Sequence, residues 1–230
     1  MCSSEIAYGL YWVAYFDLLG FRKKVERDQL GFVLQDYHEV LAAIKKETRR
    51  DVRTRGFSDT FLFYMLDDSK ESFLEINNAC RSFFHRMILK EIPLRGSLTV
   101  GELYVESDDV LIGPALVEAY DYAERQDWLG FVLIPNAREQ LKRYDVDGKA
   151  VYDLLCEHWY RDYDVPVKSG RGPESRETES LPACTMNLKR FLHGNQYLDE
   201  AQHIGDALED IEPKGTKEDA EVAPKESRRI

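Results

Sequence analysis

An aromatic strand that ends on an acidic residue is the feature that most constrains this sequence. Residues 10–16 read Leu-Tyr-Trp-Val-Ala-Tyr-Phe, a composition typical of a buried strand. Asp17 follows at once, and Gly20 comes three residues later. The segment therefore predicts a strand in the core of a sheet, with Asp17 at its end.

The segments that follow alternate between helical and strand patterns. Apolar residues recur at helical spacing over residues 29–50 and 69–89, and residues 57–65 between them predict a hairpin with Ser58 and Asp59 at its turn. Further along, the sequence predicts a strand at 93–105, a short strand ending at Ile112, a helix at 113–125, a strand at 129–134 and a helix at 135–143. This order predicts an α+β fold of the ferredoxin-like βαββαβ type, with the helices on one face of the sheet.

The pattern weakens after Tyr144, so we divide the 230-residue chain into three parts. Residues 1–145 form the main domain, residues 146–211 form a C-terminal extension that packs on it, and the charged residues 212–230 form a disordered tail. Within the extension we expect edge structure at 152–167, a flexible loop at 168–180, and one or two helices at 187–211.

The charge of the chain restricts its partners. A formal net charge of −11 argues against a nucleic-acid backbone or an anionic membrane as partner. A small anionic substrate stays compatible, because metal ions and nearby arginines reverse the field within one cleft. Basic residues do gather at 45–55, where they form either a solvated helix end or a functional patch.

The remaining composition predicts a cytoplasmic protein. There is no export signal at the N-terminus and no apolar run long enough to span a membrane. The cysteines are scattered and predict free thiols, and the histidines show no metal-ligand spacing; these residues are Cys2, Cys80, Cys156, Cys184, His38, His85, His158, His193 and His203.

Asp17 and Asp59 are the two acids that stand at strand ends without an evident structural need. If the first strand lies beside the hairpin, both carboxylates meet at one edge of the sheet. Two close carboxylates repel unless a cation neutralises them, and Mg²⁺ or Mn²⁺ suits such oxygen ligands. Each aspartate taken alone is more often a turn or cap residue.

Four segments in order resemble the class III adenylate and guanylate cyclases. Residues 16–21 (Phe-Asp-Leu-Leu-Gly-Phe) resemble the family signature Phe-Asp-Ile-x-Gly-Phe, and Ser58-Asp59 is similar to the second metal motif. Residues 95–101 resemble the strand Arg-x-Gly-Ile-x-x-Gly with Ser97 at the first glycine, and residues 112–119 resemble the segment Gly-x-x-Val-Asn-x-Ala. The resemblance covers residues 10–135 and implies a class III cyclase homology domain.

The resemblance also implies a site. Asp17 and Asp59 would bind two divalent ions, Mn²⁺ or Mg²⁺, with Leu18 lending a backbone carbonyl. Nucleotide-binding residues around them would be Phe16, Leu19, Gly20 and Phe21 in the phosphate turn, with Arg53 and Arg55 before the hairpin. Arg95, Arg55 or Arg53 would offset charge in the transition state or read the base, and for Arg95 a structural pairing at the strand start is an equal alternative.

The chain departs from purine cyclases at three positions. Val117 stands at the usual ribose-orienting asparagine, Asp121 at the usual transition-state arginine, and Arg55 at the purine-reading lysine. A compact stand-alone domain with Leu94-Arg95-Gly96, Glu118-Ala119-Tyr120 and Glu124 resembles the pyrimidine cyclases of bacterial antiphage (Pycsar) systems. The acids of this helix also fit a merely solvated face.

That family implies conversion of UTP into 3′,5′-cyclic UMP and pyrophosphate, by a symmetric homodimer whose product activates a separate effector protein. The helix at 114–125 would complete the neighbour's site. The alternatives are a cytidylate cyclase that makes cyclic CMP, and a catalytically inactive nucleotide-binding regulatory domain. A diguanylate-type enzyme is disfavoured, since a Gly-Gly-Asp-Glu-Phe motif is missing.

Overall fold

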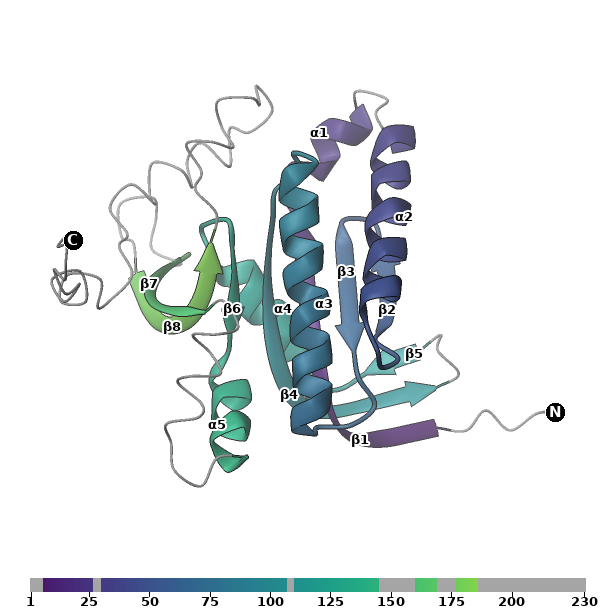
Figure 1. Ribbon diagram of the computed structural model, residues 1–230. Helices are drawn as coiled ribbons and strands as arrows, with labels where there is room; N and C mark the ends of the chain where they lie inside the picture. The colour runs from purple at the N-terminus through teal and green to yellow at the C-terminus, as the bar shows by residue number, and fades with distance from the viewer. Residues whose placement is uncertain (1–5, 27–29, 107–109, 145–159, 169–176, 186–230) are drawn as a thin grey trace, which may run out of the picture.

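A computed structural model describes residues 6–26, 30–106, 110–144, 160–168 and 177–185, which form one sheet and five helices (Figure 1). The strands are β1 (Ile6–Leu18), β2 (Arg53–Phe57), β3 (Thr60–Tyr64), β4 (Leu94–Glu106), β5 (Val110–Ile112), β6 (Gly130–Leu133), β7 (Arg161–Val167) and β8 (Glu177–Thr185). The helices are α1 (Phe21–Glu26), α2 (Leu30–Glu47), α3 (Lys70–Leu89), α4 (Pro114–Arg125) and α5 (Pro135–Arg143).

The sheet confirms the ferredoxin-like α+β prediction. Its strand order is β2-β3-β1-β4-β6-β8-β7, with β5 paired to β4, so the first four core strands take the order expected for a βαββαβ unit. β1 runs antiparallel to both of its neighbours, and Asp17 lies opposite Thr60 of β3 and Arg95 of β4. β6 is parallel to β4, and the hairpin β7–β8 extends the sheet beyond β6.

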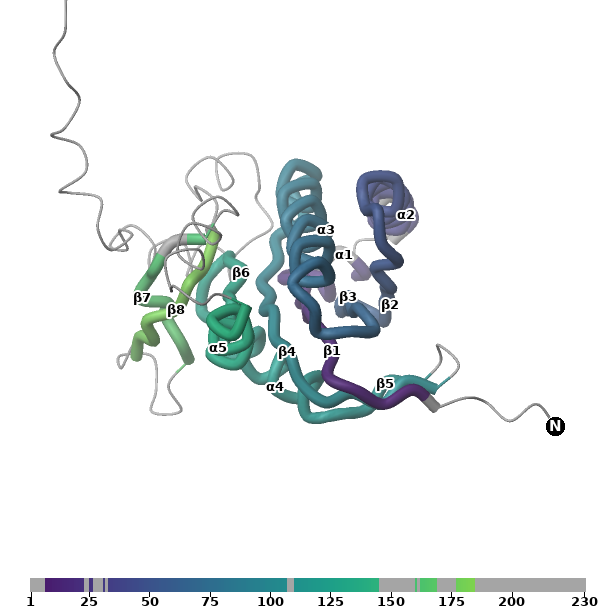
Figure 2. Tube along the Cα trace, turned by 60° about the horizontal axis from the view of Figure 1, so that its bottom comes forward, coloured from purple at the N-terminus to yellow at the C-terminus, as the bar shows by residue number. Residues whose placement is uncertain are grey.

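Successive side chains of β1 point to opposite faces of the sheet, as in any β-strand, and pack into two different layers. Trp12, Ala14 and Phe16 are buried in the large core beneath α2 and α3. Tyr11 and Tyr15 point to the other face, where they pack against the alanines on one side of α4. Figure 2 shows α2 and α3 on one side of the sheet and α4 on the other. The prediction of helices on one face is therefore wrong for α4.

Most element boundaries agree with the sequence patterns. α3 begins after Ser69, whose Oγ accepts a hydrogen bond from the Ser72 amide at 3.2 Å and caps the helix. The turn at Ser58 and Asp59 is confirmed, although β2 starts at Arg53, because pairing with β3 gives strand structure to a polar segment.

The C-terminal extension is partly described. β7 confirms the predicted edge structure for residues 161–167, while the predicted loop at 168–180 is wrong for residues 177–180, which belong to β8. Residues 152–159 and 169–176 of these two predictions lie outside the described residues. These residues are polar, and pairing with β7 decides their structure. The predicted helices at 187–211 and the tail at 212–230 lie outside the described residues. Within the described part of the chain, no helix combines the length and the apolar character needed to cross a membrane.

Gly113 is predicted to be essential for packing of α4 on the sheet. A β-carbon at this position would lie 2.4 Å from the Glu102 carbonyl oxygen and 2.8 Å from the Leu103 α-carbon. Gly113→Ala should therefore lower the free energy of unfolding by about 1–3 kcal/mol, the usual effect of overpacking.

The matched control for this change is Gly31→Ala on the exposed side of α2, where a β-carbon would meet no atom within 4 Å. This variant should change the free energy of unfolding by no more than about 0.5 kcal/mol, because a surface substitution that touches no other residue has little effect. Urea denaturation followed by circular dichroism measures both changes. Equal effects of the two substitutions would contradict the packing role of Gly113.

Candidate functional site

Asp17 lies at the end of β1 on the α4 face and is held by an arginine from the neighbouring strand. Asp17 is 8% exposed and Arg95 is 5% exposed. Arg95 Nε donates to Asp17 Oδ2 at 2.9 Å, and Nη2 lies 2.6 Å from the same oxygen. The two residues are register partners on adjacent strands, so the sheet itself brings the charges together.

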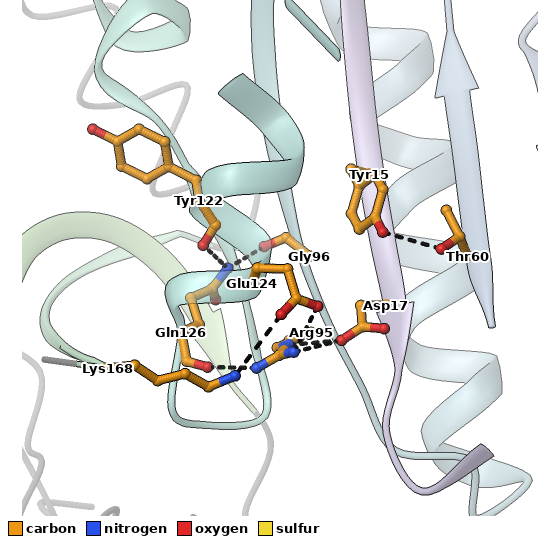
Figure 3. Close-up of polar contacts among 9 residues, drawn as sticks. All are labelled: Tyr15, Asp17, Thr60, Arg95, Gly96, Tyr122, Glu124, Gln126 and Lys168. Carbon is orange, nitrogen blue, oxygen red and sulfur yellow. Dashed lines mark hydrogen bonds and ion pairs between the residues drawn. The ribbon is translucent and has the colours of Figure 1, made fainter. Parts of the chain in front are cut away.

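Arg95 has two further partners, both from the end of α4 (Figure 3). Its Nη2 donates to Glu124 Oε1 at 2.9 Å, and its Nη1 donates to the Gln126 carbonyl oxygen at 2.8 Å. A buried guanidinium needs acceptors of this kind, since an unpaired buried charge is costly. The result is a cluster of two carboxylates around one arginine, in which Asp17 and Arg95 are buried and Glu124 is partly exposed.

The environment of Asp17 acts on its protonation. Burial raises the pKa of the Asp17 carboxyl above its usual range, and the nearby negative charge of Glu124 raises it further. The Arg95 guanidinium opposes both effects by stabilising the carboxylate. The net result is a raised pKa for Asp17. The negative charge of Asp17 therefore depends on the Arg95 guanidinium beside it.

Gln126 fixes the backbone that Arg95 binds. Its Nε2 donates to the Gly96 carbonyl at 2.9 Å and to the Tyr122 carbonyl at 3.0 Å, and its Oε1 accepts from Trp128 Nε1 at 2.8 Å. Gln126 follows the last residue of α4 and carries no pattern that sequence reasoning recognises. Its role is visible only once β4 and the end of α4 are seen together.

The hairpin turn brings Asp59 to the same end of the sheet. The Leu18 amide donates to the Asp59 carbonyl oxygen at 2.9 Å, directly beside the pairing of Asp17 with Thr60. Ser58 takes a positive φ of 56° in this turn. The charge of Asp59 is felt by Tyr37 of α2, whose pKa is raised by burial first and then by Asp59 and Asp36.

The predicted phosphate turn follows β1. Gly20 has a φ of 71°, a left-handed conformation that glycine adopts without strain, and α1 starts at Phe21. The side chains of Phe16 and Leu19 are buried in the core, so only their backbone atoms are available to a ligand. Phe21 is partly buried against the same core.

Arg53 and Arg55 lie in the edge strand β2, which β3 separates from β1. Arg53 Nε donates to Asp51 Oδ2 at 3.4 Å, and Arg55 Nη1 donates to the Thr54 carbonyl at 2.9 Å. Both residues line a cavity of about 560 Å³ between α2 and residues 48–55. Neither Asp17 nor Asp59 belongs to its lining, so this hollow is not the predicted site.

The acids of α4 are not a uniform solvated face. Glu118 accepts from Thr99 Oγ1 at 2.9 Å and from Asn136 Nδ2 at 2.8 Å, and Glu124 holds Arg95. Asp121 is exposed, and Val117 is 60% exposed. The interpretation of a solvated face is therefore wrong for Glu118 and Glu124, whose partners come from elements distant in sequence.

The residues around Asp17 fit a cation. Among the described residues, no cluster of three or more His, Cys, Asp or Glu side chains is arranged to hold a metal ion. The Asp17 carboxylate already has one cation beside it, the Arg95 guanidinium, which pairs with Oδ2. Carboxylate and carbonyl oxygens, as Asp17, Asp59 and Leu18 offer, are donors that suit Mg²⁺ or Mn²⁺.

Several solved structures have the same fold. The adenylyl cyclase CyaB from P. aeruginosa shares 14% identity over 77% of this chain and 95% of that chain, with a TM-score of 0.53. The catalytic core of a rhodopsin-guanylyl cyclase with converted specificity, solved in complex with ATPαS, shares 13% sequence identity with this chain. The match covers 78% of this chain and 98% of that chain, with a TM-score of 0.53. The adenylate/guanylate cyclase/hydrolase from Silicibacter pomeroyi shares 11% sequence identity over 78% of this chain and 98% of that chain, with a TM-score of 0.52.

Because the sequence identities to these structures are low, the similarity establishes the fold alone. No protein-family model and no curated protein sequence matches the chain. The architecture is that of the class III cyclase homology domain, as the sequence motifs predict.

We predict that Glu124→Gln lowers the pKa of Asp17. The substitution removes a negative charge that raises this pKa and keeps an oxygen that accepts from Arg95, so the guanidinium is left to one carboxylate. Titration of the carboxyl ¹³C resonance by NMR measures the shift. Asp121→Asn, an exposed change on the same helix, is the matched control and should leave the pKa in place. An unchanged Asp17 pKa in the Glu124 variant would show that the two carboxylates are not coupled.

Proposed function

We propose that this protein is a pyrimidine nucleotide cyclase that converts UTP into 3′,5′-cyclic UMP and pyrophosphate, using two divalent ions. The observation that carries the proposal is the contact of the end of β1 with the β2–β3 turn, which brings the segment of Asp17 beside the turn that carries Asp59, in a cyclase fold. The cyclase core that matches this fold was solved with ATPαS, a nucleoside triphosphate analogue. Fold alone does not decide function, so the acids and their placement carry the argument.

The chain's own groups define the chemistry. Asp17, Asp59 and the Leu18 carbonyl would hold the divalent ions, which lower the pKa of the ribose 3′-hydroxyl and neutralise the triphosphate. The 3′-oxygen attacks the α-phosphorus in line, its proton leaves to solvent, and the bond to the β-phosphate oxygen breaks to release pyrophosphate. The turn at Leu19, Gly20 and Phe21 offers backbone amides to the phosphates.

The contacts of Arg95 restrict the roles that the sequence leaves open for this side chain. Its Nε, Nη1 and Nη2 all have acceptors within the protein, namely Asp17, Gln126 and Glu124. A guanidinium engaged in this way is poorly placed to follow charge on a substrate. These contacts favour the structural pairing over charge stabilisation in the transition state or base reading. Arg53 and Arg55 then stay as the candidates for these roles, although both lie apart from Asp17 on the edge strand β2.

The choice of UTP rests on the likeness to pyrimidine cyclases, and cyclic CMP is the second candidate product. In such a system the cyclic nucleotide acts as a second messenger in antiphage defence and activates a separate effector protein. Val117 and Asp121 stand at the positions of the family's asparagine and arginine, and this replacement favours the remaining candidate, an inactive nucleotide-binding regulatory domain.

We predict that incubation with Mn²⁺ and each of the four ribonucleoside triphosphates yields cyclic UMP from UTP, as detected by mass spectrometry. Asp59→Ala should reduce the rate by about a hundredfold or more, since metal stabilisation of the transition state amounts to several kcal/mol. Asp36→Ala, which removes a carboxylate that pairs with Lys90, is the control and should retain activity.

Other outcomes of this experiment would contradict parts of the proposal. Cyclic CMP alone would reassign the substrate, and no cyclic product from any nucleotide would leave the regulatory domain as the explanation. A product that Asp59→Ala still forms at the full rate would show that the site is elsewhere.

We propose further that the chain works as a symmetric homodimer in which α4 completes the neighbour's site. Exposed apolar side chains support this, since Val117 on α4 is 60% exposed and Ile112 before it is 63% exposed. Both sites of such a dimer are equivalent, because the same surface is used twice.

Val117→Lys should weaken self-association about tenfold or more, because it buries an unpaired ammonium group in the interface. The control is Leu89→Lys at the end of α3, a residue that is 66% exposed. Sedimentation velocity over a range of concentrations measures the effect. A dimer that tolerates Val117→Lys as well as the control would place its interface on another surface.

A further inference from the structure

The geometry of the Asp17–Arg95 pair is asymmetric. A guanidinium often binds a carboxylate in a fork, with one nitrogen on each oxygen. Here Nε and Nη2 of Arg95 both approach Oδ2 of Asp17, at 2.9 Å and 2.6 Å. Among the described residues, Oδ1 receives no hydrogen bond or ion pair, and Figure 3 shows it directed away from Arg95. One oxygen is thus fixed and the other is open.

Arg95 is itself immobilised. Beyond Asp17, it donates to Glu124 Oε1 and to the Gln126 carbonyl, and it is 5% exposed. A side chain with acceptors on all three nitrogens has few other rotamers that satisfy its charge. Displacing it would leave Glu124 and a backbone carbonyl without their donor. These contacts favour an arginine that stays in place when a cation arrives.

The C-terminal hairpin supports the same segment from outside. The Lys168 amide donates to the Arg125 carbonyl at 2.7 Å, and the Asp127 amide donates to the Pro166 carbonyl at 2.9 Å. Lys168 Nζ also lies 3.9 Å from Glu124 Oε2. The residues that hold Arg95 are therefore clamped between β4 and β7. The extension thereby contributes to the arrangement of the site, although it lies outside the cyclase-like motifs.

We propose that Arg95 is a positioning residue, which fixes the Asp17 carboxylate through Oδ2 so that Oδ1 is presented to a divalent cation. This inference rests on the proposed function, in which Asp17 is a metal ligand. Outer groups that hydrogen-bond a ligating carboxylate set its orientation, and their loss commonly weakens metal binding about 10–100-fold. The rival role is that of a competing cation, which must leave before a metal binds.

The two roles predict opposite changes in metal affinity. Mn²⁺ binding to the full chain without nucleotide is measured by isothermal titration calorimetry, with the thermal midpoint as a check of folding. If Arg95 positions Asp17, Arg95→Gln weakens Mn²⁺ binding about tenfold or more. If Arg95 competes for Asp17, the same variant binds Mn²⁺ more tightly, because the competent state is no longer depleted. Tighter or unchanged binding overturns the proposal.

Arg95→Lys is the second variant and keeps the buried charge paired. A lysine lacks the planar donors that reach Asp17, Glu124 and Gln126 together, so positioning is lost while the charge remains. We expect weaker Mn²⁺ binding here too, and wild-type affinity would overturn the proposal. Arg125→Gln is the matched control, because it removes the same charge from an arginine that pairs with Glu179. This control should bind Mn²⁺ like the wild type.

Asp17→Asn separates this inference from the function on which it rests. Mn²⁺ binding that Asp17→Asn abolishes and Arg95→Gln leaves unchanged overturns the role of Arg95 alone. A wild-type chain that binds no Mn²⁺, or whose Mn²⁺ affinity is the same after Asp17→Asn, overturns the proposed metal site as well.

Discussion

The buried ion pair between Asp17 and Arg95 joins the elements on which the candidate site depends. It ties β1 to β4 and, through Glu124 and Gln126, ties both strands to the end of α4. Removing one partner of a buried pair leaves an uncompensated charge and commonly costs about 3–5 kcal/mol. Such a pair is weak as a source of net stability, but it strongly specifies which segments meet.

The register of β1 decides where this pair can form. Tyr15 and Asp17 share the α4 face, and the Tyr15 hydroxyl lies 3.0 Å from Thr60 Oγ1 on β3. A slip of one residue would exchange the two faces of the strand. Phe16 would then leave the aromatic core, where its ring lies 4.8 Å from that of Phe131. Burial of Phe16 in the hydrophobic core therefore fixes the register of β1, and with it the face of the sheet on which Asp17 lies.

The likeness to cyclase structures at low identity has a physical basis. The fold depends on which positions are apolar, on tight glycines such as Gly113, and on the strand order. Many sequences meet these conditions. The proposed site depends on a few charged groups: Asp17 and Asp59 stand where the motif resemblance predicts metal ligands, and Val117 and Asp121 stand where it predicts an asparagine and an arginine. A shared fold therefore does not by itself fix which site residues a chain carries.

The sequence by itself determined the α+β class, the order of the core elements, the hairpin turn and the glycine turn after Asp17. These features follow from local periodicity and turn chemistry, which neighbouring residues control. It did not determine that α4 covers the opposite face of the sheet, nor that residues 177–185 form β8 between β6 and β7. Only the tertiary structure brought Glu124 and Gln126 to Arg95, because these contacts span about thirty residues of sequence and depend on how a helix end docks on a strand. The same long-range pairing gave Arg95 its place beside Asp17, since an isolated arginine at a strand start carries no local signal of the charge that it will meet.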